Sequence, residues 1–68
     1  MTVAKVSEII VSSPTSFDDA IKQGVARSHK TLRNLKSAWV QSQQVELDGK
    51  GNITEYRVQL KVTFLIDD

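Results

Sequence analysis

The residues of this chain that could carry chemistry gather in its last predicted strand, residues 56–66, where apolar and polar side chains alternate. Successive residues of a strand lie on opposite faces of a sheet, so this strand has one apolar and one polar face. The polar face carries a guanidinium, an amide and an ammonium, from Arg57, Gln59 and Lys61, and the preceding segment adds the only tryptophan, Trp39. Such groups stack on planar molecules and bind polar or charged ones, which favours a binding surface.

The sequence gives no support for catalysis. It has no cysteine, and its single histidine, His29, has no second histidine or cysteine with which to share a transition metal. No serine lies in a nucleophile-elbow motif. The adjacent acids Asp18 and Asp19 fall at a predicted helix start, where the helix dipole accounts for them. We therefore expect a protein that is not an enzyme.

The segment from Asp48 to Thr54 has part of the composition of a calcium-binding loop but departs from it at three positions. The third position is Lys50, the sixth is Ile53 where such a loop needs glycine, and the twelfth is Gln59 where it needs a bidentate glutamate. Residues 48–52 have the chemistry of a tight turn instead, and we expect a β-hairpin there.

Composition and charge exclude several classes of partner. Nine basic and eight acidic residues give a net charge of +1, which leaves no electrostatic footprint for nucleic acid or an acidic membrane. No apolar run approaches the length of a membrane span, and the N-terminus lacks the pattern of a signal peptide. We expect a soluble cytoplasmic protein that binds neither nucleic acid nor membrane.

The hydrophobic pattern predicts four elements in one domain, residues 1–68. A first strand is expected over residues 3–11, followed by a helix capped by Ser16 and a second strand from about Lys36 to Leu47. We expect the helix to run for about five turns and to end near Asn34. Its apolar stripe consists of Phe17, Ala20, Ile21, Gly24, Val25, Ser28, Leu32 and Leu35.

This order predicts an α+β fold, β-α-β-β, in which one helix packs on one face of a three-stranded antiparallel sheet. Val58, Leu60, Val62 and Phe64 are expected to pack against the helix. The opposite face has no second layer, although stable domains normally have two. A chain of 68 residues also has a small core, and without disulfides or a structural metal we expect oligomerisation to stabilise it.

Three segments resemble one known family. They are Ser13-Pro14-Thr15-Ser16-Phe17, the run from Lys30 to Leu35, and the closing strand from Tyr56 to Phe64. Together with the element order they are similar to the dodecins over nearly the whole chain. This resemblance implies a hollow homododecamer whose sheets line the interior and which binds flavins, riboflavin or flavin mononucleotide (FMN), for storage.

The resemblance also implies two ligand-binding positions, and this chain differs from the family at both. Where flavin-binding dodecins have a tryptophan that stacks on the flavin, this chain has Ser37, and its tryptophan follows two residues later at Trp39. Where they have a glutamine that hydrogen-bonds the flavin ring, this chain has Arg57, and the glutamine follows at Gln59.

A shift of two residues keeps a side chain on the same face of a strand, so Trp39 and Gln59 are expected on the polar face. Because the two strands are antiparallel, a shift of two residues moves the tryptophan and the glutamine in opposite directions along the sheet, by about 7 Å each. We expect any bound flavin to adopt a different pose, with Trp39, Arg57, Gln59 and Ser37 as candidate site residues.

Two functions remain open. The first is a dodecameric protein that stores or sequesters FMN or riboflavin, in which Arg57 favours a phosphate-bearing flavin. The alternative is a dodecin-like shell that has lost the standard flavin site and binds another small ligand or a metal ion, or is structural only. Each candidate residue also has a structural interpretation: Trp39 at a subunit interface, Arg57 in a salt bridge, and Gln59 in cross-strand hydrogen bonds.

Overall fold

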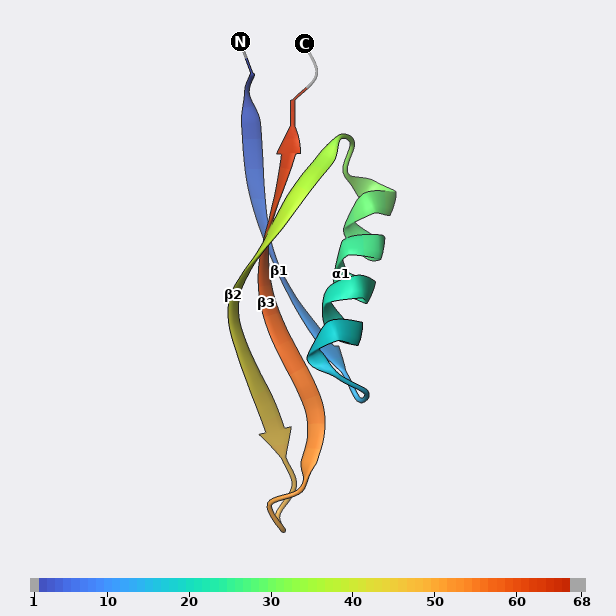
Figure 1. The fold of residues 1–68 in the computed structure, drawn as a ribbon, viewed down its shortest axis with the longest axis vertical. Helices are drawn as coiled ribbons and strands as arrows, with labels where there is room; N and C mark the ends of the chain where they lie inside the picture. Colours follow the sequence, from blue (N-terminus) through green and yellow to red (C-terminus); the bar gives the residue numbers. More distant parts are fainter. Residues whose placement is uncertain (1, 67–68) are drawn as a thin grey trace.

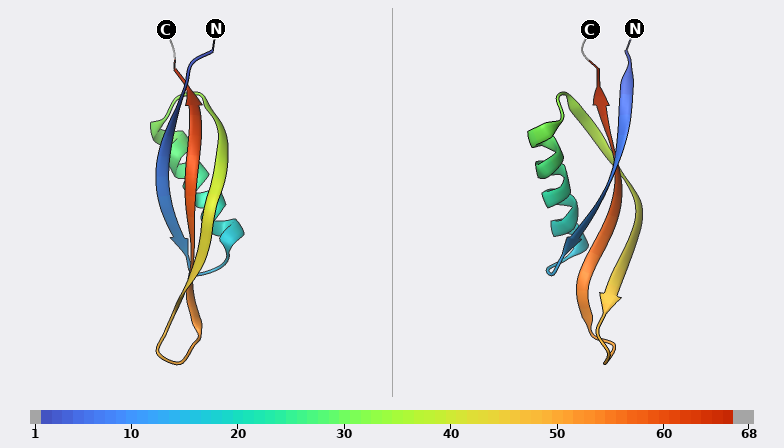
Figure 2. Two further views of the ribbon diagram at one scale, coloured as in Figure 1. Left: turned by 90° about the vertical axis from the view of Figure 1, so that its left-hand side faces the viewer. Right: turned by 180° about the vertical axis from the view of Figure 1, so that it is seen from behind.

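The computed structural model describes residues 2–66 and has the predicted element order, β1 (Ala4–Ser13), α1 (Phe17–Thr31), β2 (Leu35–Leu47) and β3 (Ile53–Leu65) (Figure 1). The three strands form one antiparallel sheet in the order β1-β3-β2, so β3 is the central strand. The helix lies on one side of the sheet and leaves the other side bare (Figure 2). The predicted α+β fold is confirmed.

The core lies between α1 and the alternating apolar residues of β3. Val58, Leu60 and Val62 are fully buried, as is Ala20 of the helix, which confirms the predicted packing face. Phe64, the fourth predicted residue, is only half-buried. Gly24 permits the close approach of helix and sheet, because an added Cβ there would lie 2.7 Å from Cγ2 of Val11.

The helix begins where the sequence predicts. Ser16 is its N-cap, and the Ser16 hydroxyl accepts a hydrogen bond from the backbone N–H of Asp19 at 2.9 Å. The buried hydroxyl of Ser13 donates to the Asp19 carboxylate at 2.6 Å and accepts from the backbone N–H of Thr15. The end of β1 is thereby joined to the first turn of α1.

The helix is shorter than predicted. It ends at Thr31, because the next residue, Leu32, has an extended backbone and serves as the C-cap. Asn34 then takes a left-handed conformation with φ 57°, which turns the chain into β2. Leu35, expected on the helix stripe, instead starts β2 and pairs with Phe64.

The hairpin between β2 and β3 is confirmed. The backbone N–H of Asp48 donates to the carbonyl of Asn52 at 2.9 Å, and Gly51 has a positive φ of 83°, which favours glycine. The strand β3 begins at Ile53, three residues before the predicted start, so the hairpin is longer than expected.

The register between β2 and β3 contains irregularities that the sequence pattern did not predict. Trp39 pairs with Lys61, but Ser42 pairs with Gln59, so an extra residue is accommodated between Val40 and Ser42. A bulge of this kind reverses which alternate residues face each side. From Ser37 to the bulge, odd-numbered residues of β2 therefore share the face of Lys61, and from Ser42 to Glu46 even-numbered residues share it.

Candidate functional site

The candidate site is the polar face, defined as the side of the sheet away from α1. Its residues are Val6, Glu8, Ile10 and Ser12 of β1, Arg57, Gln59, Lys61 and Thr63 of β3, and Ser37, Trp39, Ser42, Gln44 and Glu46 of β2. Because β3 is central, each of its residues on this face has a neighbour on both sides. The face is therefore a series of rows that cross the sheet.

One row consists of Glu8, Lys61 and Trp39. The indole of Trp39 is 66% exposed, and Nζ of Lys61 lies 5.7 Å from the centroid of its ring, within cation–π range. The same ammonium lies 4.0 Å from the Glu8 carboxylate. A large aromatic surface thus lies open on the polar face with one cation above it.

The neighbouring row consists of Ile10, Gln59 and Ser42. Gln59 accepts a hydrogen bond from the Ser42 hydroxyl at 3.3 Å and donates from Nε2 to Glu8 at 3.4 Å. These bonds orient the amide next to the row of Trp39. They match the cross-strand interpretation of Gln59, and its contact with a ligand stays a prediction.

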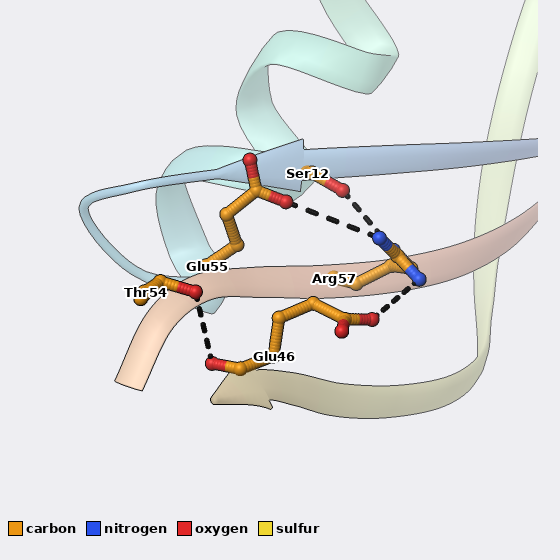
Figure 3. A network of polar contacts seen from close by, with 5 residues as sticks. All are labelled: Ser12, Glu46, Thr54, Glu55 and Arg57. Carbon is orange, nitrogen blue, oxygen red and sulfur yellow. Dashed lines mark hydrogen bonds and ion pairs between the residues drawn. The ribbon is translucent and has the colours of Figure 1, made fainter. Parts of the chain in front are cut away.

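Arg57 lies in the third row and is held by three groups of its own chain (Figure 3). Its Nη1 is 2.6 Å from Glu46, its Nη2 is 3.9 Å from Glu55, and its Nε donates to Ser12 at 3.2 Å. Planar fork geometry suits arginine to such multiple contacts. The arginine ties the β2 side of the sheet to the β1 side.

The displaced tryptophan and glutamine come close together in the sheet. Ser37 pairs with Thr63, which is six positions from Arg57 along β3, whereas Trp39 pairs with Lys61, which is two positions from Gln59. Because β2 and β3 are antiparallel, the two displacements bring the indole of Trp39 and the amide of Gln59 toward each other. The two residues are diagonal neighbours on adjacent strands of one protomer, within contact range. Of the four predicted site residues, the structure brings Trp39 and Gln59 together and leaves Ser37 and Arg57 apart.

Glu8 and Ser42 belong to this arrangement and were not among the predicted site residues. Ser42 was missed because uninterrupted alternation places it on the opposite face, and only the bulge turns it toward Gln59. The polar run of residues 41–44, which lacks alternation, was the available signal. Glu8 was missed because first-strand partners require the register between β1 and β3.

The structure gives little support for a metal site within one protomer. No group of three or more histidine, cysteine, aspartate or glutamate residues converges among residues 2–66. The Asp48 carboxylate accepts from the backbone N–H groups of Asn52 and Lys50, at 2.9 and 2.8 Å, and these bonds lower the pKa of Asp48, with the Asn52 bond as the largest cause. Asp48 thus serves the hairpin turn.

Within the described part of the chain, no helix has the length and apolar character needed to cross a membrane.

Comparison with known proteins gives consistent matches. The sequence model of the Dodecin family matches residues 3–67. The calcium dodecin of Mycobacterium tuberculosis is 39% identical over 64 residues, which cover 94% of this chain and 89% of that protein.

Solved structures agree with this. A mutant of the Thermus thermophilus dodecin is 31% identical, with full coverage of both chains and a TM-score of 0.91. The dodecin of Streptomyces davaonensis is 33% identical, with a TM-score of 0.90 and coverage of 98% of this chain and 97% of that one. The crystal structure of the M. tuberculosis calcium dodecin, described as having a novel calcium-binding site, is 35% identical, with a TM-score of 0.82 and coverage of 96% and 91%. With the β-α-β-β fold, the bare polar face and these matches, the chain belongs to the dodecin family.

Proposed function

We propose that residues 1–68 form one protomer of a homododecameric shell whose polar faces line the interior. The shape of the chain supports association, because its radius of gyration is 14.1 Å, whereas a compact domain of this length has about 11 Å. Large apolar side chains also lie exposed, among them Ile10, Leu47 and Ile53. An isolated protomer would leave these surfaces in water.

We infer that the shell binds and stores a flavin, FMN or riboflavin, and does not catalyse a reaction. The observation that carries this proposal is the open indole of Trp39 on the polar face, 66% exposed and next to the Gln59 amide. An aromatic pair contributes about 0.5–1.5 kcal/mol beyond simple burial, and an interior twofold axis would allow two indoles to enclose one planar ligand. The amide supplies hydrogen bonds to the polar edge of such a ring.

The flavin pose differs from the one that the family resemblance implies. Ser37 has no aromatic ring, so stacking at that position is excluded, and Arg57 is held by Glu46 and Glu55. Stacking on Trp39 moves the ligand toward the middle of the sheet, where Lys61 and Gln59 are its neighbours.

A titration of the purified protein with riboflavin and with FMN tests this function. Stacking on an indole quenches flavin fluorescence, so we expect quenching at micromolar concentration and a species near twelve times the 7.6 kDa chain mass. A stable monomer would rule out the shell. Full flavin fluorescence in the presence of the assembled protein would rule out flavin storage.

Calcium is the second candidate ligand, and the identity of 39% with a calcium dodecin is the observation that favours it. The carboxylates of Glu8, Glu46 and Glu55 lie on the polar face or at its end. Since no group of three such residues converges within the described part of one protomer, a calcium site would combine carboxylates of several protomers. Calorimetric titration of metal-stripped protein with calcium distinguishes this ligand from flavin.

A further inference from the structure

The polar face has two cations near its centre, Arg57 and Lys61. They differ in how many of their nitrogen donors already have partners in the same chain. All three guanidinium nitrogens of Arg57 have partners, at 2.6 Å from Glu46, 3.9 Å from Glu55 and 3.2 Å from Ser12. A ligand phosphate near Arg57 would have to displace carboxylates that already neutralise it. Arg57 is therefore poorly placed to accept a further anion.

Lys61 is held much more weakly. Its ammonium can donate three hydrogen bonds, yet among residues 2–66 its contacts are the cation–π contact with Trp39 at 5.7 Å and an ion pair with Glu8 at 4.0 Å. An ion pair at this distance between side chains that are 36% and 53% exposed contributes little. Lysine also has a flexible stem, so the ammonium can move while the backbone stays in place.

The position of this ammonium matters because it lies over the ring on which a planar ligand would stack. A flavin can stack on this face of the indole only if Lys61 moves toward the edge of the ring. A phosphate on the ligand offers the displaced ammonium a charge-assisted contact, which is stronger than an exposed cation–π contact. A neutral ligand offers no such compensation.

We propose that Lys61 is the specificity-determining residue of the Trp39 site: it caps the indole in the free protein and, when displaced, selects planar ligands that carry a phosphate. This inference rests on the proposed flavin-binding function and deepens it. Glu8 opposes the selection, because its carboxylate attracts Lys61 and repels an anionic ligand in the same row. The structure thus contains both Lys61, the cation that selects the phosphate, and Glu8, the carboxylate that opposes this selection.

The test compares FMN with riboflavin, which share one ring system and differ in the phosphate, on the assembled protein. In Lys61→Gln we expect the ratio of FMN affinity to riboflavin affinity to fall about tenfold. In Glu8→Gln we expect the ratio to rise. Lys22→Gln, on the exposed helix surface, removes the same charge elsewhere and should leave the ratio unchanged.

Each outcome bears on the inference. A wild-type protein that binds both flavins, with an unchanged ratio in Lys61→Gln, overturns the role of Lys61 while flavin storage stands. A ratio that falls in Arg57→Gln and not in Lys61→Gln assigns the phosphate to Arg57 and likewise overturns it. A wild-type shell that binds neither flavin overturns the function and the inference together.

The capping contact has a readout that needs no ligand. Trp39 is the only tryptophan, so acrylamide quenching of tryptophan fluorescence measures how accessible this one indole is. We expect Lys61→Gln to increase this quenching because it uncovers the indole. Quenching equal to that of the wild type would overturn the capping role.

Discussion

The Nη1 atom of Arg57 lies 2.6 Å from Oε1 of Glu46 and joins β3 to β2 across the polar face. The register places Glu46 directly opposite Glu55, and like charges in directly opposed positions destabilise a sheet. Arg57 reaches both carboxylates, since its Nη2 is 3.9 Å from Glu55. The arginine therefore neutralises a pair of acids that the strand pairing itself brings together.

Arg57→Gln is expected to destabilise the protein modestly, by about 0.5–1 kcal/mol, because these side chains are partly exposed and water screens their interaction. Glu46→Gln in the same background should restore part of the loss, since it removes the repulsion with Glu55. Denaturant unfolding of the two single variants and the double variant measures this coupling. Additive losses would contradict it, and Arg27→Gln on the exposed helix surface controls for net charge.

The sequence pattern was most reliable where one period holds along a whole element. The alternation in β3 correctly placed Val58, Leu60 and Val62 in the core and Lys61 on the opposite face. The capping role of Ser16 was equally clear, because a hydroxyl followed by two acids is a strong helix start signal. These features depend on local chemistry alone.

The pattern failed where two periods overlap or where the register is irregular. Leu32 and Leu35 continue the helical spacing, yet Leu35 also fits a strand. Its pairing with Phe64 places it in β2 and not in the helix. The bulge before Ser42 depends on how β2 pairs with β3, and the polar run of residues 41–44 marks only that alternation stops there, without fixing the register. A salt bridge of Arg57 was expected from the sequence, but its partners in the same chain, and the close contact of Trp39 with Lys61, could be found only from that register.

Gly24→Ala is expected to destabilise the protein by about 1–3 kcal/mol, because the added methyl group would overpack the interface between helix and sheet. Its Cβ would lie 2.7 Å from Val11 and 3.1 Å from Leu60, which is fully buried and cannot give way easily. Gly49→Ala is the matched control, since its Cβ would meet no atom within 4 Å. Thermal unfolding of both variants checks the difference, and equal melting temperatures would contradict it.

Asp48→Asn is expected to weaken the hairpin at neutral pH and to have little effect in acid. Backbone N–H groups of Asn52 and Lys50 lower the pKa of Asp48 below its usual 3.8. A carboxyl with a lowered folded-state pKa stabilises the fold above its unfolded pKa, and this contribution is lost as the pH falls through the folded-state value. Melting temperatures of wild type and variant should therefore differ at pH 7 and converge below pH 3.8. A constant difference across this range would show that the charge of Asp48 has no part in it.

Ser37→Trp combined with Arg57→Gln restores both residues that the family resemblance implies for flavin binding. Ser37 is exposed and pairs with Thr63 on the polar face, so an indole fits there without entering the core. We expect the double variant to bind riboflavin more tightly than the wild type does, with Ser37→Ala as the control for loss of the hydroxyl. Fluorescence titration measures this gain. An unchanged affinity would mean that the interior of this shell no longer accommodates the family's ligand pose.

Trp39→Ala provides the most direct test of the site, and we expect it to weaken flavin binding by about tenfold or more. The loss has to be separated from a general effect of removing apolar surface from the polar face. Ile10→Ala serves this purpose, because Ile10 is as exposed as Trp39, at 68% against 66%, and lies on the same face in the row next to it. Trp39→Phe should retain part of the affinity, since a smaller aromatic ring can still stack. If Trp39→Ala and Ile10→Ala weaken binding equally, the contribution of Trp39 is apolar contact and stacking plays no part. If Trp39→Phe binds better than Trp39→Ala while Ile10→Ala is neutral, the aromatic ring itself holds the ligand.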